Sequence, residues 1–240
     1  MMIKISECKM TTLATILYNS TRSMDLDDLD QILLTFITPF FIHRDISHNV
    51  EHVSRVVSLT DHLILYSYNR DLQGQDRHTI RCMAKIIAWL HDVDDRKYHD
   101  PTAQAEQKMT DFLTTMFPDV IVSMILKAVK YVSYSQQIKL FGDLPPEWYL
   151  HLPDTLIIAR NFVSDADKID ALGYIGIQRC LAYSKYKHSN EDEQFHVKHL
   201  IQHYNEKLKW ICPKYISTEI GHIVARHHQD VMDQEMTALA

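Results

Sequence analysis

The sequence predicts an all-α protein, on the strength of three observations. Helix-breaking residues are scarce, with 5 glycines and 7 prolines among 240 residues. Apolar residues recur at spacings of three and four, which is the period of an amphipathic helix. The alternation of apolar and polar residues that marks a half-buried strand is almost absent. A chain of this length can bury a sizeable core, so we expect a single α-helical domain over residues 1–240.

The first predicted helix begins at Asp25 and ends before Pro39. Acidic residues at its start, including Asp27 and Asp28, suit the positive N-terminal end of a helix. Its apolar positions have helical spacing: Leu26, Leu29, Ile32, Leu33, Phe36 and Ile37. Residues 1–24 show a mixed pattern, and we expect them to be poorly or only partly ordered.

The next two predicted helices cover residues 45–69 and 79–92. Valine and leucine supply most apolar positions of the first, and the second contains an apolar stretch just before His91. Residues 70–78, which separate them, are polar and include Gly74, a composition typical of a loop.

Further helices are predicted after the charged, irregular segment 93–100. Asp100 and Pro101 are typical of an N-cap followed by proline in the first helical turn. Residues 141–153 contain Gly142 and three prolines, so we expect a long loop inside the domain there. The remaining predicted helices cover residues 101–116, 119–131, 154–184, 191–211 and 217–236.

Composition argues against several classes of function. A net charge of −6 and an isoelectric point near 6.2 disfavour non-specific nucleic-acid binding. The four cysteines form no C-x-x-C pair, which is typical of reduced thiols inside a cell. We find no signal-peptide pattern and no run of about 18 apolar residues that could span a membrane. We therefore expect a cytoplasmic protein with no membrane or nucleic-acid partner.

The pair His91-Asp92 is the most informative feature of the chain. An imidazole and a carboxylate side by side can ligate one divalent ion, and such mixed ligands suit Mn²⁺, Mg²⁺, Fe or catalytic Zn²⁺. The alternative is a histidine that merely complements the dipole at the end of its helix.

Two upstream histidines could join this pair. His48 and His52 lie four residues apart and therefore share a helix face. One imidazole could bind the metal while the other donates a proton or holds a phosphate oxygen. The alternative is a pair of surface histidines on a histidine-rich helix.

A carboxylate-rich segment downstream could complete the site. Asp165, Asp167 and Asp170 lie close together with only Lys168 among them, and all three cannot serve one ion. Asp167 could be a metal ligand, or it could form a capping box with Ser164. A solvated acidic face is a further alternative.

Charged residues after His91-Asp92 could contact a substrate. Arg96 and Lys97 could bind phosphate, and Asp94 or Asp95 could orient a water molecule. A charged, solvated loop is the alternative explanation of this segment.

Together, these segments resemble the motifs of HD-domain metal-dependent phosphohydrolases, whose signature is His…His-Asp…Asp on an all-α core. The similarity is strongest to the YpgQ-like and YedJ-like hydrolases of bacteria, and it covers roughly residues 40–235. The matching motifs are His52–Val56, Leu90–Tyr98, Val132–Ser135, Asp165–Ile177 and Thr218–Gly221. The resemblance implies an HD-domain helical bundle over about residues 40–185, with additional C-terminal helices over about residues 190–238.

The resemblance also implies roles for individual residues. The implied metal ligands are His52, His91, Asp92 and Asp167, with Asp165 as the alternative to Asp167. Proton transfer would fall to His48 or Asp95. The implied phosphate contacts are Arg55, Arg96, Lys97 and Lys168.

One departure from the family leaves the role of His48 open. The aspartate that the family carries three residues before its metal-binding histidine is Asn49 here. His48, Asn49 and His52 instead look like the corresponding element of cyclic-nucleotide phosphodiesterases, in which the first histidine donates a proton and the second binds metal.

The function implied is metal-dependent hydrolysis of a small phosphorylated substrate. The subgroup points to nucleoside triphosphate pyrophosphohydrolysis, with Mn²⁺ favoured over Mg²⁺, Fe, Zn²⁺ or Ni²⁺. The alternatives are a phosphodiesterase or 5'-nucleotidase on the same metal site, and a non-catalytic metal-binding sensor or interaction module. A homodimer through the C-terminal helices is a further hypothesis.

Overall fold

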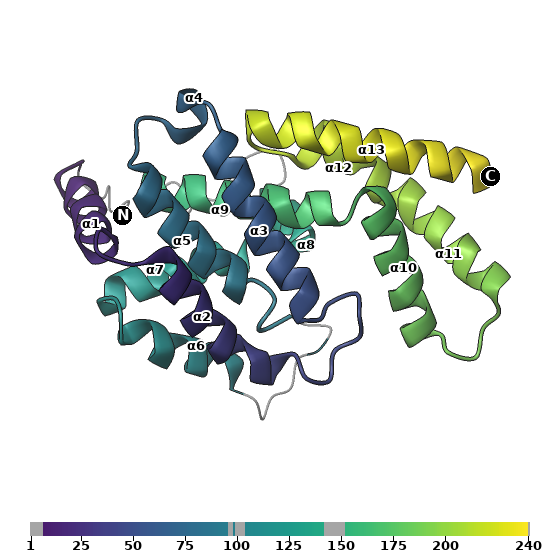
Figure 1. Ribbon diagram of the computed structural model, residues 1–240, viewed down its shortest axis with the longest axis horizontal. Coiled ribbons are helices and arrows are strands. Elements are labelled where there is room, and N and C mark those ends of the chain that lie inside the picture. Colours follow the sequence, from purple (N-terminus) through teal and green to yellow (C-terminus); the bar gives the residue numbers. More distant parts are fainter. Residues whose placement is uncertain (1–6, 96–97, 99–103, 142–151, 240) are drawn as a thin grey trace.

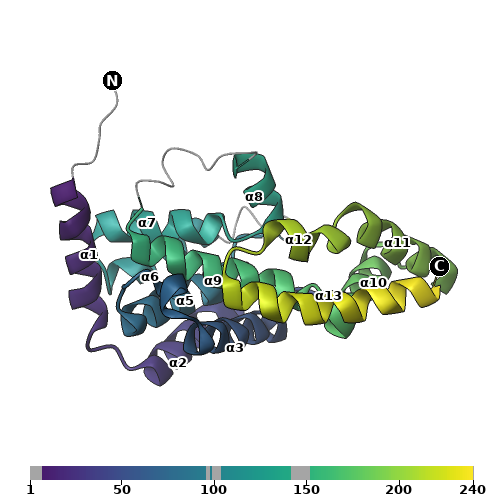
Figure 2. The same ribbon diagram turned by 90° about the horizontal axis from the view of Figure 1, so that it is seen from above.

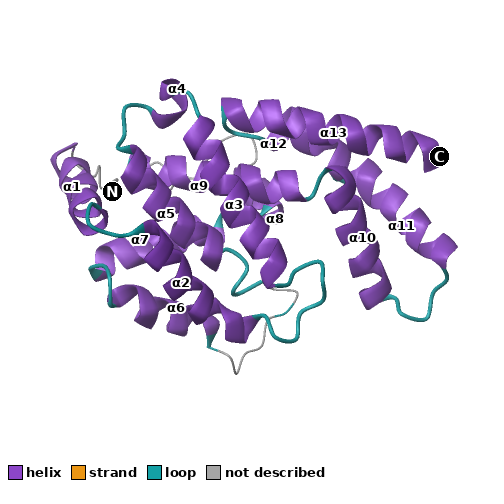
Figure 3. Cartoon of the chain, in the orientation of Figure 1, coloured by secondary structure: helices purple, strands orange, loops and turns teal. Residues whose placement is uncertain are grey.

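The computed structural model describes residues 7–95, 98, 104–141 and 152–239, and these residues form helices and no strand (Figures 1 and 3). The all-α prediction is therefore confirmed. The helices are α1 (Glu7–Thr21), α2 (Leu26–Ile37), η1 (Thr38–Phe40), α3 (Val50–Tyr66), α4 (Asn69–Leu72), α5 (Arg77–Leu90), α6 (Ala105–Thr114), α7 (Asp119–Lys130), α8 (Tyr134–Phe141), α9 (Asp154–Asp170), α10 (Gly173–Lys187), α11 (Glu193–Glu206), η4 (Leu208–Trp210), α12 (Ile211–Tyr215) and α13 (Glu219–Leu239).

Helix α5 lies at the centre of the molecule. All of its residues from Thr79 to Leu90 are buried except Arg81, although Arg77, Arg81 and Lys85 share one polar face. Helices α3 and α9 pack against α5 and against each other, so these three form the core. Asp76 begins α5 by accepting a hydrogen bond from the Thr79 amide at 2.7 Å.

Asn49 begins α3. Its side-chain oxygen accepts hydrogen bonds from the amides of Glu51 and His52 at 3.1 and 3.2 Å. Asparagine and aspartate are about equally good at this position, so the departure at Asn49 preserves an N-cap. The cap fixes the first turn of α3, which carries His52.

The predicted helix over residues 154–184 is two helices in the structure. Helix α9 ends at Asp170, and α10 begins at Gly173, whose φ is +62°. Glycine adopts this left-handed conformation without the steric penalty of a side chain, so the chain can turn between the two helices. Periodicity carries no signal of such a turn because both helices have apolar residues at helical spacing.

The C-terminal helices α10 to α13 lie to one side of the core (Figure 2). Helix α13 spans most of this side and packs against α10, α9 and α3. The predicted helix over residues 191–211 ends early, because α11 stops at Glu206 and is followed by η4 and α12.

Further expectations about the elements need correction. Residues 7–21, expected to be poorly or only partly ordered, form α1, which packs against α5 and has a fully buried Leu17. The predicted helix over residues 45–69 begins only at Val50, so His48 precedes α3 and does not share a helix face with His52. Helix α4 lies at the start of the predicted loop over residues 70–78, and α8 was not predicted. Most of the predicted loop over residues 141–153 lies outside the described residues.

Candidate metal centre

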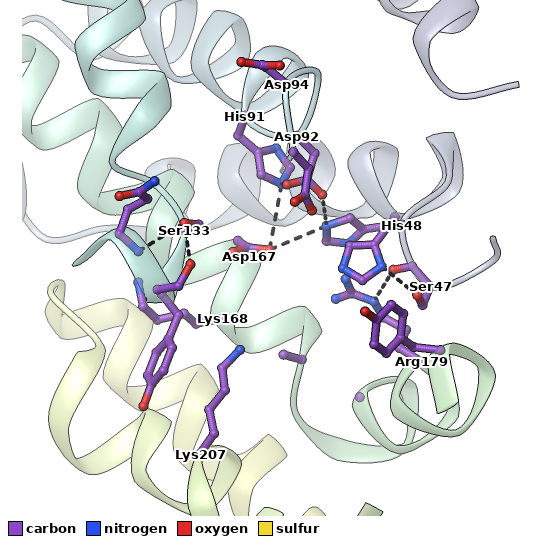
Figure 4. Close-up of a pocket in the computed structure, with 18 of the residues that line it drawn as sticks. Ser47, His48, His91, Asp92, Asp94, Ser133, Asp167, Lys168, Arg179 and Lys207 are labelled. Carbon is purple, nitrogen blue, oxygen red and sulfur yellow. Dashed lines mark hydrogen bonds and ion pairs between the residues drawn. The ribbon is translucent and has the colours of Figure 1, made fainter. Parts of the chain in front are cut away.

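The core helices bring the candidate ligands to one place (Figure 4). His52 lies in the first turn of α3, His91 and Asp92 directly follow α5, and Asp167 lies in the last turn of α9. One ligand atom from each of His52, His91 and Asp167 lies within 4.8 Å of the other two. The cluster therefore depends on how the three helices pack, and not on any one stretch of sequence.

The spacing of the ligand atoms suits a metal ion. His52 Nε2 lies 3.4 Å from Asp92 Oδ2 and 3.5 Å from Asp167 Oδ1. His91 Nε2 lies 3.6 Å from Asp92 Oδ1 and 3.8 Å from Asp167 Oδ1. These separations are too long for good hydrogen bonds, but two ligands of a tetrahedral ion with bonds of about 2.1 Å are roughly 3.4 Å apart.

Hydrogen bonds behind the two rings turn their Nε2 atoms toward the cluster. His52 Nδ1 lies 2.8 Å from Asp170 Oδ2, and His91 Nδ1 lies 2.7 Å from the Ala88 carbonyl oxygen. Both partners accept hydrogen bonds, so each neutral ring carries its proton on Nδ1 and presents a lone pair on Nε2. Both Nε2 atoms are buried, and the described residues offer them no hydrogen-bond partner. A metal ion bound between these two Nε2 atoms would accept both lone pairs.

The charges around Asp92 favour its deprotonated form, which can bind a cation. Burial by itself would raise the pKa of the Asp92 carboxyl, but the neighbouring His91 and His52 lower this pKa well below its usual value. Burial and Arg179 oppose protonation of His52, yet the carboxylates of Asp170 and Asp92 raise the pKa of His52 overall. In the absence of a cation, a proton therefore competes for this site.

Asp170 is a residue of the site to which sequence reasoning gave no role. Besides the His52 ring, it accepts hydrogen bonds from Arg55 Nε at 2.8 Å, Arg55 Nη2 at 3.1 Å and Arg179 Nη1 at 2.9 Å. Burial works against the charged form, but these donors lower the pKa of Asp170. A signal was present, because Asp170 lies three residues after Asp167 and so shares its helix face.

Arg55 was expected to contact phosphate, but in the structure its side chain binds Asp170. Its guanidinium group forms the two-pronged hydrogen bond with Asp170, behind the His52 ring. Arg55 is therefore a positioning residue, and does not line the cavity beside the cluster.

Asp165, the alternative to Asp167, lies elsewhere. Its Oδ1 accepts a hydrogen bond from the Ser217 amide, and its Oδ2 accepts from the amide and hydroxyl groups of Thr218, all at 2.8 Å. Asp165 therefore anchors the segment that leads into α13. The structure brings Asp167, and not Asp165, to the histidines.

A cavity of about 780 Å³ opens beside the cluster and receives both predicted proton-transfer residues, His48 and Asp95. The His48 ring lies edge-on to His52, with 6.2 Å between ring centroids. His48 Nδ1 lies 2.6 Å from Ser47 Oγ, which lies 2.5 Å from Asp45 Oδ1. The Tyr98 hydroxyl also donates to Asp45. His48 is therefore held at the cavity by a hydrogen-bonded chain that ends on a carboxylate.

The three predicted phosphate-binding cations other than Arg55 divide into two groups. Lys168 lines the cavity, although only 2% of the residue is exposed. Burial, helped by the charge of Arg160, lowers the pKa of Lys168 to about 7. Arg96 and Lys97 lie outside the described residues.

Arg44 is a second residue that sequence reasoning missed. Its Nη1 and Nη2 atoms donate to the carbonyl oxygens of Asp92 and Val93 at 2.7 and 2.9 Å. It therefore fixes the turn that follows α5 and carries two candidate ligands. Because Arg44 recognises only backbone oxygens, sequence alone offers no signal for this contact.

Comparisons with known proteins identify the fold. No protein-family model matches the chain, and no curated protein matches it. Three crystal structures similar to it are those of a Lactobacillus plantarum protein, of Bacillus subtilis YpgQ in complex with ADP, and of an HD-superfamily hydrolase from Bacillus thuringiensis. Their sequence identities to this chain are 23%, 17% and 20%, with TM-scores of 0.65, 0.59 and 0.58. They cover 90%, 90% and 89% of this chain, and the matches cover 96%, 95% and 96% of theirs.

These likenesses confirm the predicted relationship to the HD domain at the level of the fold. The cluster of His52, His91 and Asp167 could hold a metal ion, and it lies in a fold that is similar to that of the Bacillus thuringiensis protein. Within the described part of the chain, no helix combines the length and apolar character needed to cross a membrane.

Proposed function

We propose that this chain, which has the HD-superfamily fold, is a metal-dependent phosphohydrolase acting on nucleotides. One observation carries the proposal: the buried Nε2 atoms of His52 and His91 lack hydrogen-bond partners among the described residues and converge with two carboxylates. Four residues would hold the ion: His52, His91, Asp92 and Asp167. A divalent ion bound there would supply Lewis acidity and a bound water of lowered pKa.

The ligand set favours ions that accept both nitrogen and oxygen. It contains no thiolate, so Mn²⁺, Mg²⁺, Fe, Zn²⁺ and Ni²⁺ are the candidates, and we favour Mn²⁺. The hydrogen bonds that His52 Nδ1 donates to Asp170 and His91 Nδ1 donates to the Ala88 carbonyl oxygen hold both rings in the tautomer that any of these ions requires.

His48 is the proposed proton-transfer residue. Asp45 accepts hydrogen bonds from the Ser47 and Tyr98 hydroxyls, so the Ser47 oxygen is left to accept the Nδ1 proton of His48. In this tautomer Nε2 carries the lone pair, and we propose that Nε2 is the atom that exchanges a proton with a substrate in the cavity. Asp95, which also lines the cavity, is the second candidate for this role.

The size of the cavity supports a nucleotide-sized substrate. Its volume of about 780 Å³ falls in the range of typical small-molecule sites. Its lining combines apolar side chains, such as Met109 and Leu208, with cations that could hold phosphate. The similar YpgQ was crystallised with ADP.

Product analysis would test the proposal. Purified protein is incubated with Mn²⁺ and a panel of nucleoside mono- and triphosphates, and the products are separated by chromatography. We expect pyrophosphate and a monophosphate from a triphosphate, and none from a His52→Ala variant. The matched control is His62→Ala, which removes an exposed histidine of the same helix and should retain full activity.

Other outcomes of this experiment would identify other functions. Orthophosphate and a nucleoside would indicate a nucleotidase on the same metal site, and cleavage of a diester alone would indicate a phosphodiesterase. Metal binding with no turnover by the wild type would contradict hydrolysis and support a metal-binding sensor or interaction module.

A further inference from the structure

His48 lies on a segment without helical structure. Residues 41–49 join η1 to α3, and their backbone hydrogen bonds are those of turns, such as the one from the His48 amide to the Asp45 carbonyl oxygen at 3.1 Å. Because no regular ladder of hydrogen bonds fixes such a segment, its position depends on the contacts of its side chains and carbonyl groups. The place of His48 relative to the candidate ligand His52 depends on those contacts.

Arg179 of α10 contacts this segment next to His48, and Figure 4 shows Arg179 beside Ser47 and His48. Its Nε donates to the carbonyl oxygen of Ser47 at 2.9 Å, and this carbonyl belongs to the peptide bond that joins Ser47 to His48. Its Nη1 donates to Asp170 Oδ2, also at 2.9 Å. The same carboxylate oxygen lies 2.8 Å from His52 Nδ1. One guanidinium group therefore connects the backbone at His48 to the carboxylate behind His52.

Arg55 binds the same carboxylate in a different way. Arg55 Nε and Nη2 donate to the two oxygens of Asp170, and neither nitrogen donates to any of residues 45–48, all of which the structure describes. Arg179 divides its two donors between Asp170 and Ser47, and its side chain is 14% exposed against 35% for Arg55. A guanidinium group can bridge two acceptors because its donors point in fixed directions from a rigid plane. A lysine has one nitrogen and cannot reproduce this bridge.

We propose that Arg179 is a positioning residue, which fixes the proton-transfer residue His48 relative to the metal ligand His52 by bridging Ser47 and Asp170. This inference rests on the proposed function only in giving His48 a part in the reaction. Arg179 lines the cavity, but two of its three guanidinium nitrogens already donate to protein oxygens. Helix α10 supplies no candidate metal ligand, yet it would thereby set the distance between His48 and the ion.

Hydrogen exchange tests the bridge without turnover and without metal. The full chain is kept in a chelator, and deuterium uptake by the peptide that contains residues 45–49 is followed by mass spectrometry. We expect Arg179→Met to speed this uptake by about tenfold or more, because a hydrogen bond from a charged donor is lost and the segment opens more often. Arg179→Lys keeps a cation beside Asp170 and so serves even where Arg179→Met does not fold. It should still speed uptake by about threefold or more, because the bridge is lost.

Arg55→Met is the matched control for this measurement. It removes an arginine from the same carboxylate, and with it two hydrogen bonds, but it leaves the bridge to Ser47 in place. Its uptake at residues 45–49 should lie within about twofold of the wild type. Wild-type uptake in both Arg179 variants would overturn the inference. Equally fast uptake in Arg55→Met and Arg179→Met would also overturn it, because the effect would then come from Asp170 and not from the bridge.

A double-mutant cycle tests whether Arg179 acts through His48. At saturating Mn²⁺, Arg179→Met should lower kcat for a hydrolysed nucleotide by about tenfold or more and change KM by less than about twofold. In a His48→Gln background the same substitution should lower kcat by less than about twofold further, because residues that act as a unit are not additive. An equal loss in both backgrounds would overturn the inference. So would a raised KM with an unchanged kcat, which would make Arg179 a substrate contact.

The two experiments distinguish failure of this inference from failure of the proposed function. If no nucleotide is hydrolysed while Arg179→Met speeds deuterium uptake and Arg55→Met does not, the bridge stands and the assigned reaction is wrong. If nucleotides are hydrolysed and uptake at residues 45–49 is the same with and without Arg179, the reaction stands and the bridge is wrong.

Discussion

Replacing Asp170 by asparagine should weaken metal binding although Asp170 is not itself a candidate ligand. The carboxylate accepts four hydrogen bonds, one from His52, two from Arg55 and one from Arg179. Asparagine has a single oxygen, and its amide group would face at least one of these donors. In one orientation of the amide, the His52 ring loses its hydrogen-bond acceptor. In the other, Arg55 or Arg179 loses one.

The size of the effect follows from these contacts. Loss of a hydrogen-bonded partner behind a metal ligand costs about 10- to 100-fold in metal affinity. This factor corresponds to about 1.4 to 2.7 kcal/mol of binding free energy. Burial of an unpaired donor adds a loss of about 1–3 kcal/mol in the free energy of unfolding. The Arg55 side chain is 35% exposed, so water can partly satisfy it, and we expect the lower end of that range.

Calorimetric titration with Mn²⁺ measures the affinity, and urea unfolding in a chelator measures the stability of the metal-free fold. Asp165→Asn is the matched control, because Asp165 is also a buried carboxylate of α9 and accepts hydrogen bonds from Ser217 and Thr218. It should lower the free energy of unfolding by about 1–3 kcal/mol. Its affinity for Mn²⁺ should match that of the wild type.

An Asp170→Asn protein that binds Mn²⁺ within twofold of wild type would refute the reasoning, since the His52 ring would then need no carboxylate behind it. A large loss of affinity in Asp165→Asn would contradict the assignment of Asp167 as the ligand. Wild-type protein that binds no divalent ion would contradict the metal centre altogether.

Three further predictions concern the proton-transfer residue, the metal and the start of α13. His48→Gln should lower kcat by about 10²- to 10⁴-fold while leaving the Kd for Mn²⁺ unchanged, because His48 is proposed to move a proton and not to bind the ion. An unaltered kcat would exclude that role. Mn²⁺ at a hundred times its Kd should stabilise the fold by about 2.7 kcal/mol and raise Tm by about 5–10 °C over chelator-treated protein. Equal melting curves with and without the ion would mean that the folded state holds no such site. Gly221→Ala should destabilise the fold by about 1–3 kcal/mol even though alanine favours helices, because the new Cβ would lie 2.5 Å from Asp165 Oδ2 and 2.7 Å from Thr218 Oγ1. A urea midpoint at or above the wild-type value would show that these neighbours can move aside.

Local pattern was enough to predict the helical class and the segments that meet at the cluster. His52 and Asp167 lie on helices with a strong apolar pattern and His91 directly follows a third, and such helices must turn their apolar faces toward a common core. The resemblance to HD-domain proteins then singled out these residues among 15 histidines and 31 acidic residues.

The support behind the cluster could not be predicted in this way. The contact between Asp170 and Arg55 depends on how α3 crosses α9, and periodicity does not specify a crossing. Arg55 was assigned to phosphate because of its positive charge, but the packing of α3 on α9 places it against the Asp170 carboxylate. Lys168 was likewise chosen for its charge, and no sequence pattern showed that it would be almost fully buried.

The two walls of the cavity come from different parts of the chain, and this has a consequence for how such a protein could diversify. The candidate metal ligands belong to α3, the end of α5 and α9, whereas α10, α11 and η4 supply much of the opposite wall, including Tyr183, His203 and Leu208. Substitutions in α10, α11 and η4 can therefore change the shape of the substrate cavity without altering a residue that would bind the metal ion. A library that varies α11 alone should therefore yield variants that recognise different phosphate esters and still bind the same ion. In that case the metal-binding residues and the substrate-binding residues could evolve independently within one domain.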